Sequence, residues 1–255
     1  GQQTQHFGLG MLSNSGSQDA VAGDFGQQNF GSLVYRALLA GRPLFSLGGA
    51  WRAVELIGAG DLIWRDNNAD FNLGDRAFQA VAAVRFKIDD DRFAGLTFVY
   101  RRQRAVGVDD GGRETDAFVF DFSARWAFLR REDRVLNLGV ELVGITGTTT
   151  QTRTDVAPVS QVRQFGGAAK AAYRYRSFSV LFDWGYASGD QNPYDDKIEG
   201  FRFDRDYKVG LVLFDQVLGY QSARAGFRAA DPMLTGQPPE GVHLVPTGGG
   251  VYNAW

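Results

Sequence analysis

A strict two-residue alternation between Thr115 and Leu142 constrains the fold more than any other feature of this chain. One face of this stretch carries Phe118, Phe120, Phe122, Ala124, Trp126 and Phe128, and the other carries Val119, Asp121, Ser123, Arg125 and Ala127. After a polar turn at residues 131–133, the alternation resumes with Leu136, Leu138, Val140 and Leu142. Because successive side chains of a strand point to opposite faces, the pattern predicts a β-hairpin with one apolar and one polar face. Such a hairpin is typical of membrane-spanning β-barrels, with the apolar side toward lipid and the polar side toward a lumen.

The composition narrows the class of protein further. No apolar run approaches the roughly 18–20 residues that a membrane helix needs, so we expect no helical spans. Cysteine is absent, which excludes disulfides and thiolate metal sites, and the net charge of −2 indicates no charged partner such as nucleic acid. The first residues, Gly1–Leu12, lack the basic and apolar regions of a signal peptide. We therefore expect a fragment that lacks strands at both ends.

The predicted strands follow one rhythm along the chain. Beside the hairpin, we expect strands at 5–12, 31–40, 44–57, 77–88, 92–105, 160–175, 178–187, 206–217, 222–229 and from 249 onward. Short turns near residues 42, 90, 132, 176 and 220 alternate with long polar loops. Bacterial barrels alternate short periplasmic turns with long external loops in this way. A soluble all-β domain is the alternative, but it would need a second apolar layer to cover the aromatic faces.

The sequence thus predicts an all-β fold, an antiparallel up-and-down transmembrane β-barrel that forms one domain over residues 1–255. We expect about 12 visible strands, as part of a barrel of about 16–18 strands.

The face opposite the aromatic residues predicts the lining of the lumen. Its charged members are Arg36, Arg85, Lys87, Arg101, Asp121, Arg125, Glu141, Lys170, Arg174, Asp183 and Lys208. Basic residues outnumber acidic ones in this set, although the whole chain is slightly acidic. Rings of Arg and Lys select anions, so we expect passage of an anionic solute or acidic polysaccharide. The alternative is that these charges pair with one another and stiffen the wall, with Asp121 and Arg125 as the clearest predicted pair.

Other chemistry has weaker support in the sequence. The two histidines, His6 and His243, lie far apart, so we expect no catalytic residues, no enzyme activity and no cofactor. The loop after residue 187 places Asp190, Asp195, Asp196 and Glu199 close together, and dense oxygen ligands of this kind can hold Ca²⁺. Turn formation around Asn192-Pro193, with Asp190 as its cap, explains the same residues, and we prefer that interpretation.

Two segments resemble the alginate-export family of outer-membrane β-barrels. One runs from Asp183 to Phe214 and includes the run GYASGDQNPYDD at 185–196; the other is HFGLGMLSNSG at 6–16. Members from deltaproteobacteria are the most similar. The family has a G-R-Q element before the second segment, and here Gln2 replaces its Arg. The resemblance implies a monomeric barrel of about eighteen strands in the bacterial outer membrane, with an Arg- and Lys-lined conduit for an acidic polysaccharide.

The sequence therefore favours a porin-like outer-membrane channel that contacts lipid and passes anionic solutes. The alternative is a structural or adhesive barrel that acts through its long external loops, among them residues 230–248.

Overall fold

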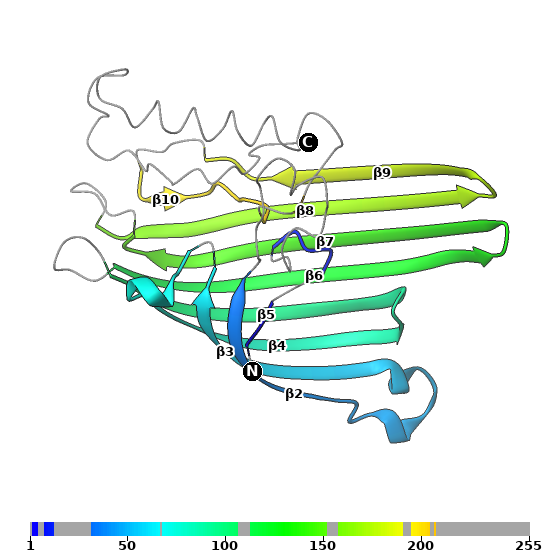
Figure 1. The fold of residues 1–255 in the computed structure, drawn as a ribbon, viewed down its shortest axis with the longest axis horizontal. Coiled ribbons are helices and arrows are strands. Elements are labelled where there is room, and N and C mark those ends of the chain that lie inside the picture. The colour runs from blue at the N-terminus through cyan, green and yellow to red at the C-terminus, as the bar shows by residue number, and fades with distance from the viewer. Residues whose placement is uncertain are drawn as a thin grey trace, which may run out of the picture.

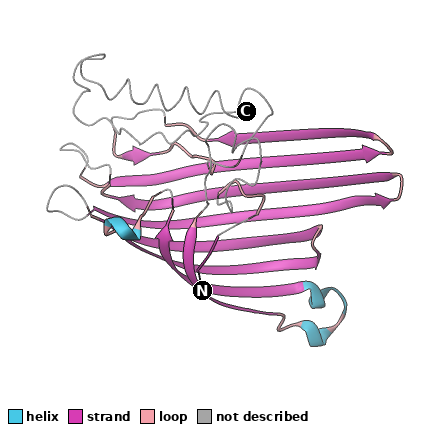
Figure 2. Cartoon of the chain, viewed as in Figure 1, coloured by secondary structure: helices cyan, strands magenta, loops and turns pink. Residues whose placement is uncertain are grey.

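The computed structural model describes residues 2–4, 8–12, 32–66, 68–106, 113–151, 158–190, 195–204 and 207, which form one β-sheet (Figures 1 and 2). The eight long strands are β2 (Leu33–Gly41), β3 (Val54–Arg65), β4 (Arg76–Asp89), β5 (Arg92–Ala105), β6 (Arg113–Arg131), β7 (Arg134–Thr149), β8 (Ser160–Tyr175) and β9 (Phe178–Ala187). The predicted all-β class is confirmed. No helix in the described part of the chain is long and apolar enough to cross a membrane.

Each strand from β2 to β9 pairs antiparallel with the next one in sequence, so the predicted up-and-down order is confirmed. The short strand β1 (Gln2–Thr4) pairs antiparallel with β2, and β10 (Lys197–Ile198) pairs parallel with β8 beyond the end of β9. Among the described residues, no pairing joins the β1–β2 side of the sheet to β9. The predicted strands at 206–217, 222–229 and from 249 lie outside the described residues.

The connections alternate between short and long, as predicted. Two-residue turns join β4 to β5, β6 to β7 and β8 to β9 at one end of the sheet, on the right in Figure 1. The predicted short turn near residue 42 is wrong, because residues 42–53 hold two 3₁₀ turns, η1 (Phe45–Leu47) and η2 (Gly49–Ala53). Gly48 and Gly49, where η1 meets η2, have positive φ values of 75° and 55°, which a residue with a side chain rarely adopts. The predicted turn near 220 lies outside the described residues.

Two predicted strand positions are also wrong. β3 covers Val54–Arg65, whereas the sequence predicted a strand at 44–57 and a loop from 59. The segment 58–61 reads Gly-Ala-Gly-Asp, which is typical of a loop, yet it pairs in register with β2 and β4. Residues 8–12 form a turn and not a strand, because Gly8 and Gly10 have φ values of 53° and 90°.

The two faces of the sheet differ in polarity and in exposure: carboxylates are buried on one face, and large apolar side chains are exposed on the other. We define the inner face as the one that carries Asp61, Asp121 and Glu141, which are 0%, 2% and 0% exposed. The outer face is the other one, and its large apolar side chains are exposed. They include Leu39, Leu56, Phe78, Val84, Leu96, Phe98, Phe118, Phe120, Leu142, Phe165, Phe182 and Trp184. The parity predicted for the aromatic residues of β4, β6 and β9 therefore matches the exposed face.

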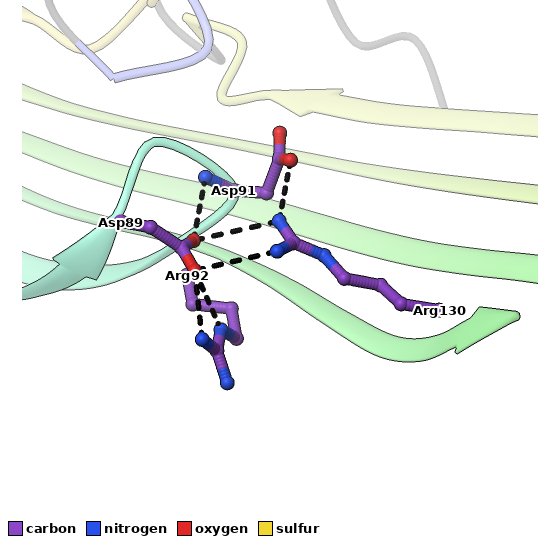
Figure 3. Close-up of polar contacts among 4 residues, drawn as sticks. All are labelled: Asp89, Asp91, Arg92 and Arg130. Atoms are coloured by element: carbon purple, nitrogen blue, oxygen red, sulfur yellow. Dashed lines mark hydrogen bonds and ion pairs between the residues drawn. The ribbon is translucent and has the colours of Figure 1, made fainter.

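An ionic cluster ties three strands together at the short-turn end (Figure 3). Asp89, the last residue of β4, accepts hydrogen bonds from Nε and Nη2 of Arg92 at 3.0 and 2.7 Å. Arg130 of β6 reaches the same carboxylate at 3.4 Å and the Asp91 carboxylate at 2.5 Å. This cluster fixes the β4–β5 turn against the end of β6.

Candidate functional site

The inner face presents its polar residues in rows that run across the strands. In one row, Arg85 of β4 pairs with Gly95 of β5, Gly95 with Ser123 of β6, and Ser123 with Glu141 of β7. The absence of a side chain at Gly95 leaves room for Arg85, because a Cβ on Gly95 would lie only 3.0 Å from Cγ of Arg85. The Arg85 side chain therefore lies against Gly95 of β5.

Asp121 and Glu141 form a buried acidic pair at the centre of the inner face. Asp121 pairs with Val143 and Glu141 with Ser123, so the two carboxylates are diagonal neighbours on adjacent strands. Neither carboxylate oxygen of Asp121 accepts a hydrogen bond from the residues that the structure describes. The predicted Asp121–Arg125 pair is wrong, since no ion pair joins them among the described residues. Arg125 lies four residues further along β6, opposite Gly139, whereas Glu141 is the diagonal neighbour of Asp121 on β7.

The Glu141 carboxylate holds a turn from the start of the chain. It accepts hydrogen bonds from the backbone N–H groups of Leu9, Met11 and Leu12, the last two at 3.4 Å. A Cβ on Gly8 would lie 2.6 Å from this carboxylate, so only glycine permits the approach. Three converging N–H groups neutralise the buried charge in part, which is the usual condition for a carboxylate removed from water.

Residues 201–204 and Tyr207 cover the adjacent part of the inner face. Phe201 lies directly on Gly166 of β8, where any side chain would overlap its ring. Together with the 8–12 turn, this segment forms an apolar cluster over β7 and β8. We call it the inner cluster, and its buried members are Met11, Val143, Ala168, Ala187, Phe201, Phe203 and Tyr207.

Basic residues border the inner cluster on the side of the short turns. Arg125, Gly139, Lys170 and Asp183 pair in sequence across β6, β7, β8 and β9. Nζ of Lys170 lies 4.8 Å from the centre of the Tyr207 ring, a cation–π contact. Arg174 lies further along β8, opposite Ser179, and is exposed. Within the described residues, no carboxylate comes within ion-pair distance of Arg85, Arg125, Lys170 or Arg174. Lys208 lies outside the described residues.

Three of the predicted lining cations are paired. Arg36 makes a two-point ion pair with Asp61, and Lys87 lies 2.8 Å from Asp90. Arg101 contacts Asp66 at 2.5 Å and Gln103. These three ion pairs agree with the alternative prediction that charges of the inner face pair with one another and stiffen the wall. They also leave fewer unpaired basic side chains on the inner face than the sequence predicted.

The sequence interpretation missed Asp61 and Asp66 because it placed them in a loop. Burial alone would raise the pKa of Asp66, but the Arg101 guanidinium and the N–H groups of Asn68 and Ala69 hold that pKa below its usual value. Ile63, two positions after Asp61, continues the alternation on the same face, and this pattern could have predicted that the strand extends past residue 57.

The described part of the acidic loop after β9 has hydrogen bonds typical of turns, whereas Asn192-Pro193, the centre of the predicted turn, lies outside the described residues. Asp195 accepts a hydrogen bond from the Lys197 N–H at 2.8 Å, and Asp190 accepts one from the Glu199 N–H at 3.4 Å. Asp196 accepts from the Gln161 amide at 3.4 Å. No group of three or more His, Asp or Glu side chains in the described part of the chain is arranged to hold a metal ion.

No protein-family model, curated protein or solved structure matches this chain. The resemblance to alginate-export barrels therefore stays a prediction. What the arrangement can do follows from the geometry alone: an inner surface with a buried acidic pair, unpaired cations beside it and an apolar cluster over part of it can bind or guide a charged solute.

Proposed function

We propose that the chain is part of an outer-membrane β-barrel that conducts anionic solutes or an acidic polysaccharide along its inner face. The observation that carries this proposal is the inverted polarity of the sheet. Phe120 is 55% exposed on the outer face of β6, while its neighbour Asp121 is 2% exposed on the inner face. Water penalises an exposed aromatic wall of this extent, and lipid does not.

The dimensions of the apolar wall support a bilayer as its solvent. The apolar outer positions of β6 run from Phe118 to Phe128. This interval spans about 33 Å along a strand, or about 25 Å at a tilt near 40°, which equals the usual apolar band of outer-membrane barrels. Closure into a barrel and the total number of strands belong to the same proposal.

The unpaired cations support the choice of solute. Arg85, Arg125, Lys170 and Arg174 come from three strands and share the inner face near the short turns. A cluster of this kind in a low-dielectric wall attracts anions, and guanidinium groups bind carboxylates by two hydrogen bonds. Asp61 and Asp66 neutralise Arg36 and Arg101. Arg85 and Lys170 have Glu55 and Asp183 as register partners, but neither cation forms an ion pair among the described residues.

Planar-bilayer recordings on the full-length protein test the proposal. We expect reversal potentials in a salt gradient to show anion preference, and the double variant R85E/R125E to reduce it at least tenfold. The variant R102E, on the outer face, is the matched control and keeps the wild-type selectivity. Cation selectivity that R85E/R125E leaves unchanged would contradict the proposal.

A second candidate function rests on the inner cluster. The 8–12 turn, residues 201–204 and Tyr207 cover the inner face over β7 and β8, which favours a closed barrel that acts through its external loops. A wild-type protein that inserts into bilayers without conductance, and that loses surface binding when residues 230–248 are deleted, would support this candidate over a channel.

A further inference from the structure

The outer face has a hollow that the channel function does not use. Its volume is about 610 Å³, and Phe120, Gly144, Thr146, Arg163, Phe165 and Tyr186 are among its lining residues. It lies toward the end of the strands that carries the long connections, since β6 enters at Arg113 and β8 at Ser160.

Gly144 forms the floor of this hollow. It pairs with Phe120 on one side and with Phe165 on the other, so a glycine stands between two aromatic rings in one row. No atom lies within 4 Å of a Cβ built on Gly144, so the space above it is open. A second, mostly apolar hollow of about 670 Å³ shares Phe120, Gly144 and Phe165 and continues toward Leu142 and Phe98.

Arg163 places a positive charge in the hollow, near the start of β8 and the long connection that precedes it. Its guanidinium donates one hydrogen bond, to the Gln161 side chain at 2.9 Å, and makes no ion pair with the residues that the structure describes. Arg102, an outer-face cation on β5, differs in this respect because Asp116 lies 3.9 Å from it. Thr146 is the register partner of Arg163, and Glu199 also lines the hollow.

We propose that this hollow binds a phosphorylated lipid of the surrounding bilayer, with an acyl chain against Gly144 and the phosphate at Arg163. The inference rests on the proposed membrane location. An apolar slot between two rings accepts a hydrocarbon chain, and an unpaired guanidinium at its polar end binds phosphate by two hydrogen bonds. Basic pockets at the membrane surface recognise anionic head groups by the same charge complementarity. The negative charge of Glu199, which also lines the hollow, opposes the binding of a phosphate.

Native mass spectrometry of the full-length, delipidated protein in detergent tests this site, with phosphatidylglycerol and phosphatidylcholine of identical chains as probes. We expect the wild type to bind phosphatidylglycerol at least fivefold more strongly. R163Q should abolish that preference, R163K should retain part of it, and E199Q should increase it. G144F should weaken the binding of both lipids.

The matched control is G58F. Gly58 is also an open outer-face glycine, but its register partners are Leu39 and Ala82 and no cation lies beside it in that row. We expect G58F to bind both lipids as the wild type does. Equal binding of the two lipids by the wild type, or an unchanged preference in R163Q, would overturn the inference.

Conductance and detergent dependence, measured on the same samples, separate the two proposals. If the wild type and R163Q insert and conduct alike but show no lipid preference, only the lipid site is wrong. If the protein is monodisperse without detergent, the membrane location itself is wrong. Should G144F fail to fold, as judged by circular dichroism, the R163Q and E199Q results still decide the question.

Discussion

Arg36 of β2 and Asp61 of β3 are directly opposite in register and form a two-point ion pair in which both nitrogen–oxygen distances are 2.6 Å. Asp61 is fully buried, and the Arg36 side chain is 12% exposed. Removing Arg36 leaves the Asp61 carboxylate buried without its ion pair, which costs far more than the pair itself contributes.

We therefore expect Arg36→Met to lower the free energy of unfolding by about 3 kcal/mol. The double variant R36M/D61L should recover most of this loss, because it leaves no buried charge. Urea unfolding in detergent, followed by tryptophan fluorescence, measures both. Arg102→Gln is the control, since the exposed Arg102–Asp116 pair should contribute at most about 1 kcal/mol. A single variant as stable as the double one would contradict this account.

The second prediction concerns Glu141 and the turn that it holds. Glu141→Ala removes three hydrogen-bond acceptor contacts, so the amides of Leu9, Met11 and Leu12 should lose protection from hydrogen exchange at least tenfold. In bilayers, the conductance of Glu141→Ala should exceed that of the wild type because part of the inner cluster is released. Glu132→Ala, at an exposed turn position, should change neither quantity. Unchanged protection in Glu141→Ala would show that the turn is held by other contacts.

Gly8→Ala tests the same contact from the opposite side. A Cβ at this position meets the Glu141 carboxylate, and the φ of 53° adds backbone strain. We expect this variant to reproduce the exchange behaviour of Glu141→Ala, while Gly41→Ala, whose Cβ meets nothing within 4 Å, should not.

The third prediction follows from Asp66, which lies just after β3. Because the pKa of its carboxyl is lower in the folded state than its ordinary value of 3.8, Asp66 stabilises the fold above about pH 4. That contribution is lost as the pH falls through the folded-state pKa. The melting temperature of the wild type should therefore fall more steeply between pH 5 and pH 3 than that of Asp66→Asn. Asp90→Asn, an exposed site, controls for the loss of a charge. Identical pH profiles for the wild type and Asp66→Asn would refute the prediction.

The fourth prediction concerns the exposed cluster in Figure 3. Arg130 is 44% exposed, and Asp91 is 57% exposed, so water screens their attraction. Arg130→Gln should cost less than about 1 kcal/mol, and the difference from the wild type should disappear in 1 M salt. Unfolding at two salt concentrations measures it. A loss that salt leaves unchanged would show that Arg130 acts by packing.

The sequence predicted those strands in which alternation is unbroken. β5, β8 and β9 begin and end where the pattern placed them, because each has apolar residues on one parity and a clear polar turn beside it. β3 was misplaced because glycines at 58 and 60 remove the outer apolar signal, and Asp61 then looked like a loop residue.

The contacts of the inner face join residues that are far apart in the sequence, so local sequence patterns could not predict them. The strongest partner of Glu141 is the Leu9 N–H, 132 residues away. The spacing of Asp121 and Arg125 suggested a pair, but the register of β6 against β7 brings Glu141 beside Asp121 instead. Parity predicted which face each charge occupies, whereas partner choice follows from strand register and from glycines that admit a neighbouring side chain.

The length of β6 determines which residues would be accessible outside the proposed membrane. At 19 residues it exceeds the roughly 9–11 that cross a bilayer. If the sheet spans the outer membrane as we propose, its apolar outer positions on β6 begin at Phe118, and the part from Arg113 to Ala117, with the end of β7 paired to it, extends beyond the lipid. In that orientation, an antibody or a phage would touch exposed side chains of this paired segment, Glu114 and Thr148 among them, before it reached the membrane.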